Sequence, residues 1–581
     1  MLAAPLFALV AATLTAGSPV YPGLSASKLV ARQSAPTVSI SNGTLVGRSE
    51  PGFKQEFFLN VPYAQAPTGD LRLANPQPVN STWTDNYDAS SWGNVCPGTG
   101  ISSTPNVTLG QDYTLDEDCL NINIIRPAGV TEGDKLPVLF WIYGGGFVQG
   151  TANDPRYNGT YLVQRSVENG EPIVFASINY RLGAFGFPAG EAAAEQGVLN
   201  LGLKDQRLSL HWVQENIASF GGDPSKVTIW GQSAGGMSVT SQLLAYGGRN
   251  DGLFRGAAID SGIFAYQNNT LSSQQNTWSG PYVGLLKPAV LNATGCTAGS
   301  DELSCLRALP YDTFFDAFVN SSYSGQPIPD GDFLLDSSVQ AIADAKVNPV
   351  PILVGATRDE ATSGIGAPVG LNNETALRAA VVRGFRNVAR TNASIDRLLE
   401  LYPNDNEIGC PFGTGDGVVS TGLQDKRSNA MWTDTINAGS RFMAQKHGYL
   451  APVWSWRFWQ VPQNNTIDAG AAHANELPYL FGVLNRTVRT PLGNRPGDLD
   501  TSKRMQNYWL NFVNHLDPNV GAVLVEQSAN AILIIAEDVH WPTYDSGSEQ
   551  IIFQNNKTRI VKDDERVEPM RFQIQLALGQ A

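Results

Sequence analysis

Short hydrophobic runs, each bounded by turn-forming residues, recur along the chain from about residue 120 onward. They read INIIRP, PVLFWIY, PIVFASI, VTIW, GAAID, PILVGAT and PVWSWRF. Short apolar runs of this kind are typical of strands buried on both faces. Between several of them lie helical patterns, the clearest being LKDQRLSLHWVQENIASF, which Gly221-Gly222 ends. Strands alternating with helices predict an α/β fold, with a central, mostly parallel sheet covered by helices on both faces.

Two longer stretches lack strand patterns. Residues 265–345 and 370–450 mix amphipathic runs with Pro and Gly, and we expect them to be helical insertions between strands of the sheet. No internal repeat, low-complexity tract or Gly/Ser linker divides the chain. The sequence therefore predicts one α/β domain over residues 34–581.

The N-terminus has the pattern of a secretory leader. Residues 1–17 are mostly apolar, contain no acidic residue and are too few to span a bilayer, although a basic start is missing. A buried N-terminal helix is the alternative. Residues 18–33 predict a short propeptide or linker. N-glycosylation acceptor sequences favour secretion, because only chains on that route can use them; they include Asn42, Asn80, Asn106, Asn158, Asn268, Asn292, Asn373, Asn392, Asn464, Asn485 and Asn556.

Composition narrows the class of protein further. A formal net charge of −14 disfavours nucleic acid as a partner. No second apolar stretch reaches membrane length, so we expect an extracellular protein without stable membrane insertion. Five cysteines allow two bridges in an oxidising compartment. The simplest choice is local pairing, of Cys96 with Cys119 and of Cys296 with Cys305, which leaves Cys410 as a free thiol.

The segment VTIWGQSAGGMSV carries the first candidate for catalysis. An apolar strand leads into Gly231-Gln232-Ser233-Ala234-Gly235, and a helix-compatible run follows. This is the G-x-S-x-G turn, in which the small residues on either side of the serine allow a bend tight enough to expose its hydroxyl. In a chain with 58 glycines a bare match is weak, and a Gly-rich turn is the alternative. The strand before it and the helix after it favour a nucleophile.

A second glycine-rich loop fits the other half of such a site. Gly144-Gly145-Gly146-Phe147 directly follows the PVLFWIY run. Consecutive glycines let backbone amides approach the negative charge that forms on an attacked carbonyl, and the N–H of Ala234 is a further donor. A serine nucleophile also needs an adjacent base. The candidates are His211, His447, His473, His515 and His540, of which the chain order Ser, acid, His excludes His211.

Several segments together resemble the type-B carboxylesterase and cholinesterase-like lipase family, over nearly the whole chain after the leader. They are WIYGGGFVQG, SINYRLGAFGF, KDQRLSLHWVQENIASFGGDPSKVTIWGQSAGG, GATRDEAT, HANELPYLF and YWLNFVNHLDPN. The segment YPNDNEIGCPFGTG is similar to one found in the fungal lipase and esterase branch. The resemblance implies an α/β-hydrolase fold, a Ser/Glu/His triad and no metal or organic cofactor.

The resemblance also implies roles for single residues. The nucleophile falls on Ser233, the acid on Glu360, the base on His473, and the oxyanion donors on the backbone amides of Gly145, Gly146 and Ala234. The choice of Glu360 over its neighbour Asp359 rests on the resemblance alone. The family's two disulfides agree with the local pairing above. One position departs from the family: the residue before the nucleophile is usually Glu and is Gln232 here, which puts activity on choline esters in doubt.

The loop between the first two cysteines bears on the substrate. CPGTGISSTPNVTLGQDYTLDEDC is short, has few large apolar residues and contains no Trp. We therefore expect a secreted carboxylesterase acting on soluble or moderately apolar small-molecule esters. A triacylglycerol lipase and a feruloyl or other aryl esterase are the alternatives, and a cholinesterase is disfavoured. The alternative of another class is a catalytically inactive binding protein of the same fold, although such proteins typically lose the nucleophile.

Overall fold

The computed structural model describes residues 35–99, 114–263, 290–296, 302–321, 325–363, 367–368, 370–385, 388–389, 391–415, 423–463, 469–484, 496–520 and 539–581. The expected leader, 1–17, and the expected propeptide or linker, 18–33, lie outside these residues. The same is true of the acceptor sites Asn106, Asn268, Asn464 and Asn485.

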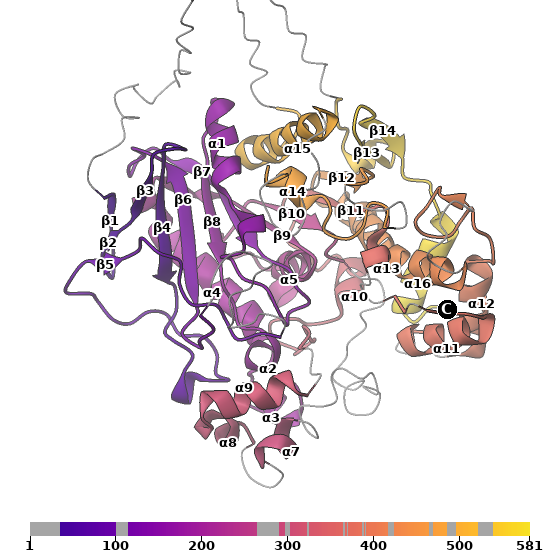
Figure 1. Cartoon of the computed structure of the whole chain (residues 1–581), viewed down its shortest axis with the longest axis horizontal. Coiled ribbons are helices and arrows are strands. Elements are labelled where there is room, and N and C mark those ends of the chain that lie inside the picture. The colour runs from indigo at the N-terminus through magenta and orange to yellow at the C-terminus, as the bar shows by residue number, and fades with distance from the viewer. Residues whose placement is uncertain are drawn as a thin grey trace, which may run out of the picture.

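Eleven strands within the described residues form one sheet (Figure 1), in the order β14-β13-β12-β11-β10-β9-β7-β8-β6-β4-β3. They are β3 (Arg48–Glu50), β4 (Gln55–Pro62), β6 (Asn121–Pro127), β7 (Leu136–Ile142), β8 (Val174–Ile178), β9 (Gly222–Gln232), β10 (Gly256–Asp260), β11 (Ile352–Thr357), β12 (Val453–Phe458), β13 (Glu549–Phe553) and β14 (Arg559–Lys562). The central strands, from β8 through β7 and β9 to β13, are parallel, and both edges pair antiparallel. The predicted α/β fold with a mostly parallel sheet is confirmed.

The seven hydrophobic runs of the sequence form the strands β6 to β12. Every residue of β6, β7, β8, β10, β11 and β12 is buried, which explains why these strands show no alternation of polar and apolar residues. β9 is longer than the run VTIW, because it already begins at Gly222. A small separate sheet of β1 (Thr37–Ile40), β2 (Gly43–Val46) and β5 (Tyr87–Asp88) lies outside the set that the runs predicted.

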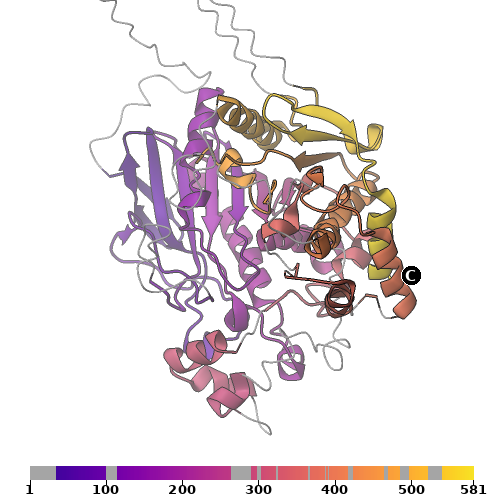
Figure 2. The same ribbon diagram turned by 45° about the vertical axis from the view of Figure 1, so that its right-hand side comes forward.

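Helices cover both faces of the large sheet (Figures 1 and 2). On one face, α1 (Thr160–Glu168) and α15 (Pro496–His515) pack on each other and on the strands between β6 and β9. The other face carries α4 (Leu201–Asn216), α5 (Ala234–Gly248) and α13 (Leu423–His447). After a 3-10 turn that follows α4, Gly221 takes a left-handed conformation with φ 84°, so the helical segment ends where the sequence predicted.

The two predicted insertions contain helices and no strand in the residues described, with irregular segments at 325–337 and 402–415. In the first, α7 (Leu291–Thr294), α8 (Glu302–Ala308) and α9 (Tyr311–Val319) pack with α2 (Gly183–Gly186) and α3 (Glu191–Glu195) around a hydrophobic core of their own. We call these five helices the satellite lobe; it lies at the bottom of Figure 1. The second contains α11 (Glu374–Phe385), α12 (Asn392–Leu401) and most of α13.

The remaining helices lie near the ends of the last strands. α10 (Ser338–Ala343) precedes β11, α14 (Leu477–Leu480) follows β12, and α16 (Val567–Ala577) ends the chain beside α12 and α13. Ser233, Ser261, Glu360 and His473 follow β9, β10, β11 and β12, which are neighbours in the sheet. Carboxyl ends of parallel strands are where α/β proteins place their functional side chains.

Candidate active site

The bend after β9 is as tight as the sequence predicted. Ser233 has φ 58° and ψ −125°, a conformation that a residue with a side chain rarely adopts. A Cβ on Gly231 would lie 2.4 Å from the backbone of Gly235, and one on Gly235 would lie 2.0 Å from the carbonyl oxygen of Ile142. The N–H of Ser233 donates to the carbonyl of Asp260 (2.9 Å), and α5 begins at the next residue. The serine is thus fixed between a central strand and a helix N-terminus.

The glycine loop after β7 lies against this bend. A Cβ on Gly144 would come within 2.9 Å of the Cβ of Ser233, so only a glycine lets the two segments approach this closely. Gly145 and Gly146 have φ of 118° and 67°. A Cβ on Gly145 would clash with the backbone of Gln149, whereas one on Gly146 would meet only a methyl group, at 3.8 Å. The predicted oxyanion donors therefore belong to two segments in contact.

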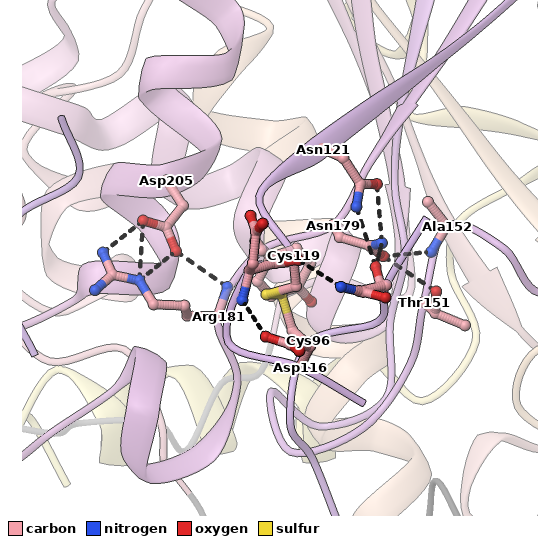
Figure 3. The surroundings of a disulfide bond; sticks show 12 residues. Cys96, Asp116, Cys119, Asn121, Thr151, Ala152, Asn179, Arg181 and Asp205 are labelled. Carbon is pink, nitrogen blue, oxygen red and sulfur yellow. Dashed lines mark hydrogen bonds and ion pairs between the residues drawn. A yellow bond between two sulfur atoms is a disulfide. The ribbon is translucent and has the colours of Figure 1, made fainter. Parts of the chain in front are cut away.

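The far end of the glycine loop is anchored by a buried amide. The side-chain oxygen of Asn179 accepts hydrogen bonds from the N–H of Ala152 (2.9 Å) and the hydroxyl of Thr151 (3.1 Å). Its nitrogen donates to the side chain of Asn121 (3.2 Å). Figure 3 shows this network beside the Cys96–Cys119 disulfide. The loop is therefore held to the ends of β6 and β8, close to a covalent link.

The structure brings Glu360 and His473 together after β11 and β12. Nδ1 of His473 donates to Oε2 of Glu360, which is fully buried. Oε1 of Glu360 accepts from the hydroxyl of Ser261 (2.6 Å) and the N–H of Thr357 (2.7 Å). Burial alone raises the pKa of Glu360, but the charge of His473 and these hydrogen bonds outweigh burial and leave the pKa below its ordinary value. Glu360 is therefore an ionised carboxylate able to orient the imidazole.

Asp359, the neighbour of Glu360, points to different partners. Its carboxylate accepts hydrogen bonds from the backbone N–H groups of Ala471 (2.9 Å) and Phe412 (2.8 Å). The thiol of Cys410 lies 3.6 Å from it. Burial raises the pKa of Asp359. Asp359 thus supports the loop that carries His473, while Glu360 contacts the imidazole itself.

The other imidazole nitrogen has an unexpected partner. Nε2 of His473 lies 3.0 Å from the side-chain nitrogen of Gln232, the residue before the serine. Within the described residues no hydrogen bond joins His473 to Ser233. Catalytic hydrogen bonds are often long or misaligned until substrate binds, so this geometry does not remove His473 as the base.

Two further acidic side chains are buried behind the Glu360–His473 pair. Glu476 is 0% exposed, and neither of its carboxyl oxygens has a hydrogen-bond partner among the described residues. Asp260 accepts a hydrogen bond from the indole N–H of Trp230 (2.7 Å). Burial, together with the neighbouring carboxylates, raises the pKa of both Glu476 and Asp260 well above the ordinary range. Both are therefore neutral acids under mildly acidic conditions.

The five cysteines take the states that the sequence predicted. The structure forms disulfides between Cys96 and Cys119 and between Cys296 and Cys305, and Cys410 is a buried free thiol. In the part of the chain that the structure describes, no group of three His, Cys, Asp or Glu side chains could hold a metal ion. None of the described helices is long and apolar enough to cross a membrane.

A serine on a strand-to-helix bend, a glycine loop in contact with it and a buried carboxylate-imidazole pair define the serine hydrolases of the α/β-hydrolase fold. The comparison with known families is more specific: the chain belongs to the carboxylesterase family, whose model matches residues 34–573. It is therefore a carboxylic ester hydrolase, and the family resemblance seen in the sequence is confirmed.

Curated relatives and solved structures agree with this assignment. The chain is 33% identical to the secreted triacylglycerol lipase LIP1 of Gibberella zeae, over 92% of this chain and 89% of that protein. It is 36% identical to secreted lipase 1 of Botryotinia fuckeliana, over 89% of each chain. The crystal structure of EstA from Aspergillus niger superposes with a TM-score of 0.77 and 27% identity, covering 94% of this chain and 99% of EstA.

Proposed function

We propose that the chain is a secreted serine carboxylesterase that works through an acyl-enzyme. The proposed roles are nucleophile for Ser233, general base for His473, orienting acid for Glu360, and backbone oxyanion donors for Gly145, Gly146 and Ala234. The observation that carries the proposal is the buried Glu360–His473 pair next to the strained bend at Ser233. Residues 34–581 would form the catalytic domain.

In the proposed reaction, Oγ of Ser233 attacks the ester carbonyl carbon while Nε2 of His473 takes the hydroxyl proton. Ionised Glu360 stabilises the resulting imidazolium, and the backbone N–H groups stabilise the negative oxygen of the tetrahedral intermediate. The intermediate collapses, and His473 passes the proton to the departing alcohol. Water then attacks the acyl-enzyme, loses a proton to His473 and releases the carboxylic acid, which restores Ser233.

The proposed substrates are soluble or moderately apolar esters. A small, solvent-open hollow lies beside the first turns of α5, and none of the three proposed triad residues lines it. Its lining combines apolar side chains such as Met237, Ile263 and Leu334 with the hydroxyl of Ser241 and the carboxylate of Asp336. Lining a long alkyl chain with such polar groups is unfavourable, because they would lose their contact with water. The short loop between Cys96 and Cys119 supports the same preference.

A triacylglycerol lipase is the second candidate. It is favoured by the relatives from Gibberella zeae and Botryotinia fuckeliana, which are named lipases.

The same two names, which include the word secreted, support secretion of this chain with residues 1–17 as its leader. Among the acceptor sites, the exposed residues Asn80, Asn292, Asn373, Asn392 and Asn556 are the proposed glycan carriers.

Hydrolysis of p-nitrophenyl esters with increasing acyl length tests both the proposed serine mechanism and the choice between esterase and lipase. We expect a burst of p-nitrophenol, labelling by a fluorophosphonate, and highest activity on short acyl chains in true solution. Ser233→Ala should lose activity and labelling. Ser209→Ala is the control, because that buried hydroxyl bonds only within its own helix (2.7 Å to the carbonyl of Gln206). Activity that appears only above the solubility limit of long-chain esters would favour the lipase, and full activity of Ser233→Ala would refute the nucleophile.

A further inference from the structure

The hydrogen bond between Gln232 and His473 has a defined direction. A carboxylate can only accept, so the bond to Glu360 requires the proton of the neutral imidazole to sit on Nδ1. Nε2 then carries a lone pair and can only accept, and the amide nitrogen of Gln232, 3.0 Å away, must be the donor. The lone pair engaged by Gln232 is thus the one that must remove the proton of Ser233.

The side chain of Gln232 is held in place from two directions. Gln232 is the last residue of β9, where it pairs with Asp260 of β10, and it is only 2% exposed. A Cβ on Gly144 would lie 3.3 Å from Oε1 of Gln232, so the amide packs against the backbone of the glycine loop. The His473 side chain is 6% exposed. Water therefore has little access to replace either partner of this hydrogen bond.

We propose that Gln232 is a positioning residue that holds the imidazole of His473 in its unprotonated form and releases it when Ser233 reacts. The proposal rests on the proposed function, since it assigns a partner to the same base. Release follows from the chemistry: Nε2 has a single lone pair, so it must leave the amide of Gln232 to accept the serine proton. Once protonated, Nε2 is a donor and cannot bond the amide N–H again, because two donors cannot pair. A glutamate at this position would instead attract the imidazolium.

Among the described residues, three carboxyls lie next to the imidazole or to its partner Glu360. Glu360 contacts the ring from the end of β11 and is ionised, Asp260 lies on β10, and Glu476 lies three residues after His473. Burial raises the pKa of Asp260 and Glu476 well above the ordinary range, so both remain neutral at acidic pH. Neither of these two carboxyls is therefore expected to change its charge across the acidic limb of the pH–rate profile.

The decisive variant is Gln232→Met, which keeps the length of the side chain but removes the donor. Without the donor the neutral imidazole loses one hydrogen bond, so the acidic limb of kcat/KM should move to higher pH by about half a unit to one unit. On the acidic side of the limb this corresponds to a loss of about three- to tenfold, which should disappear on the plateau of the profile. KM should stay within about twofold, because Gln232 faces the base and not the ester. Gln214→Met, which removes a side-chain amide bound to the carbonyls of Pro224 and Leu253, is the control.

Gln232→Glu extends the series. An acceptor carrying a negative charge should favour the imidazolium, so its acidic limb should move further than that of the Met variant. If the acidic limbs of both variants lie at the same pH as the acidic limb of wild type, the proposal is wrong. If either variant fails to fold, a crystal structure of wild type phosphonylated on Ser233 decides: Nε2 of His473 should face the adduct with Gln232 beyond 3.5 Å, and an intact Gln232–Nε2 bond would refute release. Failure of the proposed function is a separate result, seen as an unlabelled wild type or an active Ser233→Ala.

Discussion

At the scale of single residues, environment separates acidic side chains of nearly identical chemistry. Glu360 receives three hydrogen bonds and the charge of His473, so its pKa is lowered in spite of burial. Asp359, Asp260 and Glu476 are as deeply buried, and burial raises the pKa of each. The chain thus keeps one ionised carboxylate beside His473 and places near it carboxyls whose charged form burial disfavours, which limits repulsion in the interior.

Replacing Glu476 by Gln should change how stability depends on pH. Because the pKa of Glu476 is higher in the folded chain than in the unfolded one, the folded chain binds more protons between the two values. The contribution of Glu476 to stability therefore falls as pH rises above the ordinary glutamate pKa of about 4.3 toward the raised pKa of the folded chain. Glu476→Gln removes this contribution, so its melting temperature should decline less over that range. Thermal unfolding at pH 5, 6, 7 and 8 measures it, with the exposed Glu132→Gln as control. Identical slopes in wild type and Glu476→Gln would contradict the prediction.

Ser261 is expected to hold the carboxylate of Glu360 in position. Its hydroxyl donates to Oε1 of buried Glu360 at 2.6 Å, and hydrogen bonds to charged groups contribute about 1.5–3 kcal/mol. The N–H of Thr357 remains as a second donor, so Ser261→Ala should lower kcat about tenfold without abolishing it. Steady-state kinetics should show this loss with KM unchanged. Ser440→Ala is the control, since that hydroxyl bonds within α13 (3.1 Å), and equal kinetics for the two variants would exclude the supporting role.

At the scale of elements, glycines decide how closely the segments of the site approach. Gly144 brings the loop after β7 to the serine, while Gly231 and Gly235 allow the bend itself. None of these positions has room for a methyl group: each would meet another atom within 3 Å. The bend is therefore specified by missing side chains as much as by the serine.

Gly235→Ala tests this point. Its added Cβ would lie 2.0 Å from the carbonyl oxygen of Ile142, which forces the backbone apart. We expect a loss of roughly 3 kcal/mol in the free energy of unfolding and activity reduced at least a hundredfold. Gly52→Ala is the matched control, because nothing lies within 4 Å of its added Cβ, and it should stay within about 0.5 kcal/mol of wild type. Urea unfolding and ester hydrolysis measure both quantities. An active, stable Gly235→Ala would show that the bend tolerates a side chain.

Local patterns predicted the elements of the sheet well and the contacts between them poorly. Completely buried strands such as β7 and β11 appear in the sequence as apolar runs, so they could be found. β3 and β14 have only partly buried or exposed residues and leave no such run. The bend at Ser233 could be predicted because its two glycines, Gly231 and Gly235, lie close to the serine in the sequence. The bond from Gln232 to His473 spans 241 residues and carries no local signal, and neither does the bond from Ser261 to Glu360.

At the scale of the whole molecule, two hydrophobic cores meet near the glycine loop. The satellite lobe has its own core, and Gln326, next to that lobe, donates to the carbonyl of Gly146 (3.0 Å). Arg72 donates to the carbonyls of Leu306 and Leu309 and pairs with buried Glu117, just before Cys119. The lobe is therefore joined to both the loop and the first disulfide by polar contacts.

The two disulfides should consequently differ in their effect on catalysis. Cys296 lies in the satellite core, so the Cys296→Ser/Cys305→Ser pair should lose about 3 kcal/mol locally, expose the lobe to proteases and lower kcat/KM less than about fivefold. Cys96 and Cys119 are fully buried in the main core beside the Asn179 network, so their replacement should lower kcat/KM much more. Limited proteolysis and kinetics on both pairs check this. If replacing Cys296 and Cys305 lowers kcat/KM more than replacing Cys96 and Cys119, the prediction is wrong.

The order of β9, β11 and β12 along the polypeptide has a consequence for biosynthesis. β9, the strand that precedes Ser233, leaves the ribosome before the other two. His473, whose imidazole contacts Gln232 at the end of β9, is added 241 residues after Gln232. With the roles proposed above, a nascent chain, or one truncated ahead of β12, contains Ser233 but lacks His473, its proposed base. With these proposed roles, ester cleavage would require synthesis to pass His473, and incomplete copies of the chain would carry an unactivated serine.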